Sequence, residues 1–336
     1  MSWNDNEYIS ASGILYRGVI QDVPKSQKVL VPVFEAFTNA LEAIRSREDK
    51  VDNGTIRIVL RCSEELDGSP QFVSLTIEDD GIGFNDDEFR RFLTYKDFRK
   101  GYKNRGSGRV QLIHHFDQTE YISIFRDNGQ HYKRLFSISK NDLYLDKNAI
   151  TLHKSTSAIP AEELRTSLTM RILLDPKSKT YHELTAKKLK EELLKRYMHY
   201  FCHHKNILPN ITIEYYRWEE LRESETIQVS DVPGVDKADS FVLEYHAVSG
   251  NGRTLTKTAD KEEFTLDAYR IDKDRLGQNQ LRLASKGEII DTVELDLGFL
   301  GKDETIHGDR FLFVVSSNYI DNQDSDDRGS LKIPTR

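Results

Sequence analysis

Apolar positions in the first half of the chain recur with two different periods. Residues 26–47 predict a helix, because apolar side chains return at helical spacing, as at Phe37, Leu41 and Ile44. Shorter helices are predicted at 86–95 and 109–116. Alternating, β-rich segments predict strands at 55–62, 72–78, 120–125, 132–139 and 167–174.

The pattern changes after Pro176. A long helix is predicted at about 181–204, and it has the character of a strut between domains. Later segments again read as strands, at 211–216, 240–248, 280–285, 288–295 and 311–317. The sequence therefore predicts an α+β protein with a first domain at 1–180, a connecting helix at 181–205 and a second domain at 206–336.

Composition narrows the class of protein. The 336 residues are 38% hydrophobic and 31% charged, with a net charge of −7, which fits a globular protein that is not a strongly basic nucleic-acid binder. Apolar runs are shorter than the roughly 20 residues of a membrane helix, so no membrane partner is expected. The first residues lack a secretory pattern, and two cysteines, Cys62 and Cys202, suit a reducing cytoplasm.

The helix at 26–47 carries an unusual polar pair. Glu35 and Asn39 are four residues apart, so they project from one face of the helix, close to its apolar stripe. A solvated helix face is the simple explanation. A functional pair requires partners elsewhere in the chain.

Glycines follow the strand at 72–78 in the segment IEDDGIGF. Glycine lets the backbone turn sharply and lets a ligand come close, as at Gly83. Asp80, at the strand end, is placed to accept a hydrogen bond from a ligand amine. A calcium loop fails because Thr76 stands at its first acidic position. A plain acidic turn remains the alternative.

A second glycine segment precedes the helix at 109–116. It is not a P-loop, because Ser107 stands where the lysine is required. Gly106 and Gly108 nevertheless leave backbone N–H groups open at a helix start, which suits a phosphate. Thr169, on a strand, is either a simple β-former or a hydroxyl that reaches an adenine edge. A metal site formed by Cys202, His203 and His204 is not expected, because a fourth ligand is missing.

In this order along the chain, these motifs resemble the GHKL ATPases, the superfamily of gyrase B, MutL, MORC proteins and histidine kinases. The resemblance implies a Bergerat-fold α/β sandwich that binds ATP and Mg²⁺. It makes Glu35 the general base, Asn39 the Mg²⁺ ligand and Asp80 the partner of the adenine amine. The remaining implied roles are Gly83 against the base, Gly106 and Gly108 in a lid at 95–108, and Thr169 behind the adenine. Two departures are Glu42 for the usual aspartate of the helix motif and Leu168 for the glycine before the threonine.

The second domain resembles the transducer domain of MutL and MORC proteins, which has a ribosomal-protein-like β-α-β fold. Residues 283–291 and 311–333 carry this resemblance. It places Arg328 near the basic residue that touches the γ-phosphate, with Lys286 as a second candidate for that catalytic contact.

Together these resemblances imply an ATP-dependent switch. ATP would join two copies into a homodimer, and slow hydrolysis would reset them. Glu35 favours hydrolysis, since histidine kinases have asparagine there. By analogy, DNA transactions or bacterial anti-phage defence would be the setting, with DNA or an effector subunit as partner. The alternatives are a nucleotide-sensing scaffold without hydrolysis and a chaperone-like binding module.

Overall fold

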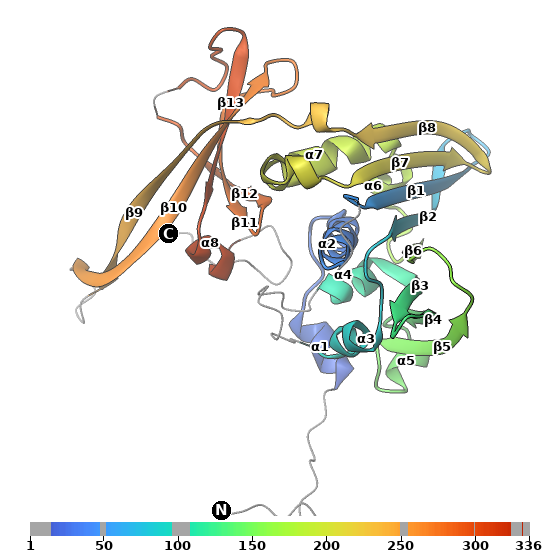
Figure 1. Cartoon of the computed structure of the whole chain (residues 1–336). Helices are drawn as coiled ribbons and strands as arrows, with labels where there is room; N and C mark the ends of the chain where they lie inside the picture. The colour runs from blue at the N-terminus through green and yellow to red at the C-terminus, as the bar shows by residue number, and fades with distance from the viewer. Residues whose placement is uncertain are drawn as a thin grey trace, which may run out of the picture.

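The computed structural model describes residues 15–47, 52–95, 108–248, 255–298, 300–323 and 331. Its strands form two mixed sheets, one of eight strands and one of five (Figure 1). Helices lie mainly with the first sheet, so the expected α+β class is confirmed. Among the described residues, no helix has the length and apolar character needed to cross a membrane.

The eight-stranded sheet has the order β5-β4-β3-β6-β2-β1-β7-β8. Its neighbours pair antiparallel, except β1 and β7, which pair parallel. Its strands are β1 (Thr55–Glu64), β2 (Pro70–Asp79), β3 (Phe116–Asp127), β4 (Gln130–Ile138), β5 (Thr151–Ile159), β6 (Arg165–Leu173), β7 (Asn210–Arg217) and β8 (Glu220–Ile227).

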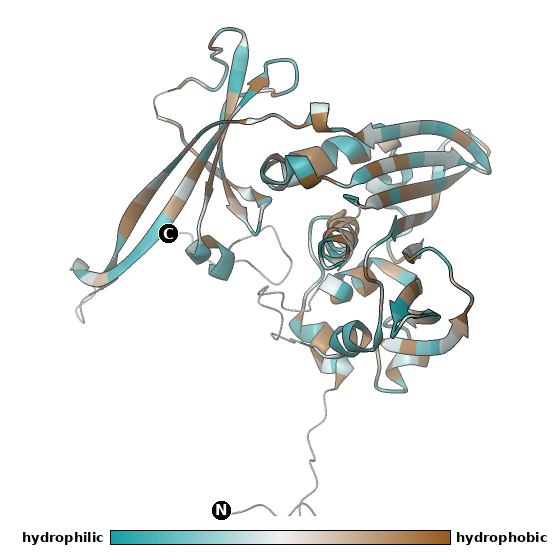
Figure 2. Ribbon diagram, in the orientation of Figure 1, coloured by the Kyte–Doolittle hydropathy of each residue, from teal (hydrophilic) through white to brown (hydrophobic). Residues whose placement is uncertain are grey.

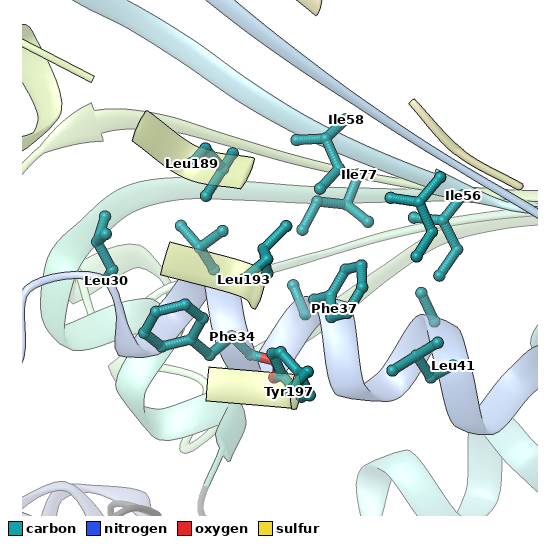
Figure 3. Close-up of a cluster of buried hydrophobic side chains, with 14 of the residues drawn as sticks. Leu30, Phe34, Phe37, Leu41, Ile56, Ile58, Ile77, Leu189, Leu193 and Tyr197 are labelled. Atoms are coloured by element: carbon teal, nitrogen blue, oxygen red, sulfur yellow. The ribbon is translucent and has the colours of Figure 1, made fainter. Parts of the chain in front are cut away.

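Helices pack against this sheet and enclose the main core. Strand β1 alternates, with Ile56 and Ile58 fully buried, and Figure 3 shows them facing Phe37 of α2 and Leu193 of α7. Helix α2 is hydrophobic along much of its length in Figure 2. The result is a two-layer α/β sandwich. The helices of this part are α1 (Tyr16–Asp22), α2 (Val31–Arg45), α3 (Asp86–Leu93), α4 (Gly108–His115), α5 (Asp142–Leu145), α6 (Lys179–His182) and α7 (Ala186–His203).

The five-stranded sheet has the order β12-β11-β13-β10-β9. Its strands β11 and β13 pair parallel, and β12 rather than a helix follows β11. The short helix α8 follows β13, so it is not the crossover between this parallel pair. The elements of this part are β9 (Val235–Val248), β10 (Leu255–Asp272), β11 (Gln280–Ser285), β12 (Glu288–Leu295), β13 (Asp309–Ser316) and α8 (Asn318–Gln323).

The long helix expected at 181–204 is divided in two. Thr185 caps α7 by accepting a hydrogen bond from the Lys188 amide at 3.3 Å, which separates α7 from α6. Strands β7 and β8 extend the first sheet, whereas the sequence placed residues from 206 onward in the second domain. The pairing of β1 with β7 decides this, and the two sheets divide between Ile227 and Val235.

Candidate functional site

One face of α2 carries a row of three residues, one per turn: Glu35, Asn39 and Ala43. At a rise of 1.5 Å per residue, the row is about 12 Å long. Glu35 is only 3% exposed, whereas Asn39 is exposed. Each end of the row meets a glycine, Gly108 beside Glu35 and Gly81 beside Ala43. The row therefore runs between two glycine-bearing segments that lie far apart in sequence.

Gly108 touches the carboxylate of Glu35 directly. A Cβ atom at this position would lie 2.0 Å from Glu35 Oε2, so no other residue fits without moving the carboxylate. Gly108 is also the first residue of α4. The buried carboxylate thus stands beside the positive end of a helix, where backbone N–H groups favour anions. Gly106 and most of the expected lid at 95–108 lie outside the described residues.

The glycines after β2 fit closely against their surroundings. A Cβ at Gly81 would lie 2.5 Å from the Cβ of Ala43, and the Ile82 amide donates a 3.2 Å hydrogen bond to the Ala43 carbonyl. Gly83 has a φ of +68°, which strains any residue with a side chain, and its Cβ would lie 2.8 Å from Ser123 Oγ. These contacts hold the loop between α2 and β3.

The two aspartates before these glycines have different surroundings. Asp79 is 8% exposed, and its Oδ1 accepts a 2.9 Å hydrogen bond from the Gly81 amide. Burial raises the pKa of Asp79 to about 7, and the neighbouring charge of Asp80 adds to the shift. Across the sheet Asp79 pairs with Thr166, whose hydroxyl lies 3.0 Å from Ser123 Oγ.

The carboxylate of Asp80 stabilises the turn between α2 and β1. Its Oδ1 accepts a 2.9 Å hydrogen bond from the Thr55 amide and lies 3.2 Å from Arg47 Nη1. Arg47 also reaches Asp52 at 2.8 Å. The structure therefore assigns Asp80 to the junction of α2 and β1.

Because side chains alternate along a strand, Asp79 and Asp80 lie on different faces of the sheet, and so do Thr166 and Thr169. Asp79 follows the buried Leu75 and Ile77 at steps of two, so it lies on the helix-covered face of β2. Thr166 shares that face of β6 with Leu168 and Met170, which are also buried. Thr169 lies on the opposite face.

The hydroxyl of Thr169 lies 3.0 Å from that of Thr76 on β2. The structure thus brings together Asp79, Thr166 and Ser123, and it does not bring Asp80 and Thr169 to them. The sequence did not single out Asp79 and Thr166 as candidates for the site. The alternation of buried residues along β2 and β6 was the signal that identifies them.

The second sheet approaches α2 through the hairpin of β11 and β12. Lys286 lies in its turn with a φ of +51°, and its amide donates a 2.7 Å hydrogen bond to Asp321 of α8. Glu288 accepts hydrogen bonds from Thr38 of α2 at 2.9 Å and from Arg196 of α7 at 2.8 Å. Thr38 directly precedes Asn39. Arg328 lies outside the described residues.

No protein-family model and no curated protein matches the sequence. Among solved structures, the chain is similar to the N-terminal domain of a DNA repair protein, at 10% identity over 94% of this chain and 91% of that chain, with a TM-score of 0.48. It is also similar to the Aquifex aeolicus MutL ATPase domain complexed with ADP, at 11% identity over 88% of this chain and 92% of that chain, with a TM-score of 0.37. At these TM-scores, neither similarity defines what the chain does.

Proposed function

We propose that the chain is a GHKL-type ATPase, which binds ATP with Mg²⁺ along α2 and hydrolyses it slowly. The observation that carries the proposal is the contact between Glu35 and Gly108. It places a buried carboxylate at the first N–H groups of a helix, so a general base and a phosphate cradle share one location.

The phosphate end of the site uses α4 and α2. The N-terminus of α4 favours the negative charge of a triphosphate, and Glu35 is the base for the attacking water. Asn39 stands one turn away and is exposed, so its carboxamide oxygen is available to the hard Mg²⁺ ion. The bound ion would neutralise phosphate charge as the bond to the γ-phosphate breaks.

The adenine end uses Asp79 in the role that the sequence suggested for Asp80. Asp79 is buried beside Gly81 and Gly83, whereas the carboxylate of Asp80 already holds Arg47 and Thr55. Thr166 takes the role that was expected of Thr169, because it pairs with Asp79 across the sheet. A buried carboxylate accepts the hydrogen bonds of an amine and discriminates against a carbonyl at the same place.

The output of the proposed ATPase is a conformational change. ATP would bring two copies together as a homodimer, and either Lys286, in the turn between β11 and β12, or Arg328 would contact the γ-phosphate. The hydrogen bond between Glu288 and Thr38 already joins that sheet to the site helix. A switch of this kind would act on DNA or on an effector subunit, for example in anti-phage defence.

The test measures ATP binding by calorimetry and phosphate release on the full chain with Mg²⁺. Glu35→Ala should retain ATP binding but lose about a hundredfold or more of the hydrolysis rate, the usual contribution of a general base. Arg45→Ala, exposed on the same helix and outside the motif, is the control and should keep the wild-type rate. Wild-type turnover in Glu35→Ala, or no ATP binding at all, overturns the proposal. Tight ATP binding by the wild type without turnover would instead identify the nucleotide-sensing scaffold.

A further inference from the structure

Two histidines and an aspartate meet where α7 crosses β10. His199 and His203 are one turn apart on α7, so they lie on the same face of the helix. His203 Nε2 lies 2.9 Å from Asp267 Oδ2, and His199 Nδ1 lies 3.8 Å from the same oxygen. One potential ligand atom from each of the three residues lies within 4.8 Å of the others.

The carboxylate of this cluster is incompletely satisfied. Asp267 is 1% exposed, and its Oδ1 has no hydrogen-bond partner among the described residues. A buried acceptor without a donor is costly, and more so when it is charged. The ring of His199 is held in place by the Tyr269 hydroxyl, which lies 2.8 Å from its Nδ1.

We propose that His199, His203 and Asp267 bind one first-row transition-metal ion, of which Zn²⁺ is the test case. Two imidazoles and one carboxylate form a donor set for zinc, iron, cobalt or nickel, whereas calcium and magnesium prefer oxygen ligands alone. The side chain of His203 is 42% exposed, so the ion has a path from solvent and water can complete its coordination.

The proposed site differs from the set of consecutive residues Cys202, His203 and His204, which was not expected to bind a metal. Cys202, His203 and His204 point about 100° apart around the helix and do not converge. His204 instead stacks on Tyr200 and contacts the Tyr200 carbonyl at 2.8 Å. The structure replaces two members of that set with His199 and Asp267. Because Asp267 belongs to the second sheet, the ion would tie that sheet to the long helix of the first part.

The experiment titrates the metal-stripped full chain with Zn²⁺ by calorimetry in a buffer that does not chelate. The wild type should bind one ion per chain. His203→Gln and Asp267→Asn should each weaken binding by about a hundredfold or more, since even supporting residues of metal sites contribute 10- to 100-fold. His204→Gln, at the residue that directly follows α7, should keep the wild-type affinity. Co²⁺ should give visible absorption bands in the wild type that are lost in His203→Gln.

Thermal unfolding supplies a second readout that does not depend on ATP turnover. Zn²⁺ should raise the melting temperature of the wild type and of His204→Gln, but not of His203→Gln. Because His203 is largely at the surface, its substitution is not expected to unfold the chain. If the wild type fails to bind Zn²⁺, or if His203→Gln or Asp267→Asn binds it as tightly as the wild type, the cluster is an ion pair only and the proposal is wrong.

Discussion

The hydroxyl of Thr38 on α2 donates a 2.9 Å hydrogen bond to Glu288 on β12. The same hydroxyl lies 2.8 Å from the hydroxyl of Tyr197 on α7, which in turn donates to the Phe34 carbonyl at 2.9 Å. Glu288 also holds Arg196 on α7. One polar network therefore joins the site helix, the long helix and the second sheet, immediately beside Asn39.

Removing the Thr38 hydroxyl should weaken this network. Thr38→Val removes one hydrogen bond from Glu288 and one from Tyr197 in a partly buried place, which should lower the free energy of unfolding by about 1–3 kcal/mol. Urea denaturation measures the change. Thr38→Ser keeps the hydroxyl and is the control; if it loses as much stability as Thr38→Val, the hydrogen bonds are not the cause.

Removing Glu288 should lower the free energy of unfolding by more than removing the Thr38 hydroxyl does. Arg196 is 2% exposed, and Glu288→Ala would leave its charge buried and without its carboxylate partner, at a cost of about 3–5 kcal/mol. The control is Arg61→Ala, because Arg61 pairs with the exposed Glu219 and such pairs contribute about 0–1 kcal/mol. If chemical denaturation showed equal losses of stability in the two variants, burial of the ion pair would not explain the cost of removing Glu288.

Gly108→Ala should disable the site through Glu35. The added methyl group would lie 2.0 Å from Glu35 Oε2, so the carboxylate or the start of α4 must move. We expect ATP hydrolysis to fall by at least about tenfold, as the proposed base leaves its position. Gly18→Ala on α1 is the matched control, since its Cβ has nothing within 4 Å. That variant should keep its activity and gain up to about 1 kcal/mol of helix stability. An unchanged rate in Gly108→Ala would remove Glu35 from the mechanism.

Asp79 should make the ligand-free protein less stable as the pH rises. Its pKa is about 7 in the folded state, against an ordinary value of 3.8 for an aspartate exposed to water. Between about pH 4 and pH 7 the folded state therefore holds a proton that the unfolded chain has released. This contribution to stability is complete below about pH 4 and is lost as the pH approaches 7, at about 1.4 kcal/mol per pKa unit.

Asp79→Asn should remove the loss of stability that the wild type shows as the pH rises. The variant should be more stable than the wild type at pH 8 and similar to it at pH 4, as measured by denaturation, while binding ATP more weakly. Asp80→Asn is the comparison: it should destabilise the turn held by Arg47 and Thr55 and change ATP affinity little. If Asp80→Asn weakened ATP binding and Asp79→Asn did not, Asp80 would be the residue that contacts the adenine.

The basic residue that contacts the γ-phosphate can be identified by comparing two variants. Arg328→Ala or Lys286→Ala should lower hydrolysis and weaken ATP binding by about tenfold or more, since a charge-assisted contact contributes roughly 1.5–3 kcal/mol. ADP affinity should stay nearly unchanged, because ADP lacks that phosphate. If neither variant alters turnover, the second sheet acts only through contacts such as Thr38 with Glu288.

Local sequence determined the elements and most of the residues around the site. The apolar period at Phe37 and Leu41 predicted α2, and alternation predicted strands such as β1 and β2, because these periods follow from backbone geometry alone. The glycine segments were also visible, since Gly83 adopts a backbone conformation that few other residues accept. Strands β5, β8 and β10 were missed. The first two are sheet edges with largely exposed side chains, so neither shows a strong apolar alternation.

Tertiary structure alone decided which residues meet. The sequence shows that Asp79 and Asp80 project to opposite faces of a strand, but the packing of α2 determines which face is enclosed. The same holds for Thr166 and Thr169. The pairing of β1 with β7 moved β7 and β8 into the first sheet, and the crossing of α7 and β10 brought Asp267 to His199 and His203. Contacts of this kind join residues far apart in the chain, and their energies depend on how whole elements pack, which no local period encodes.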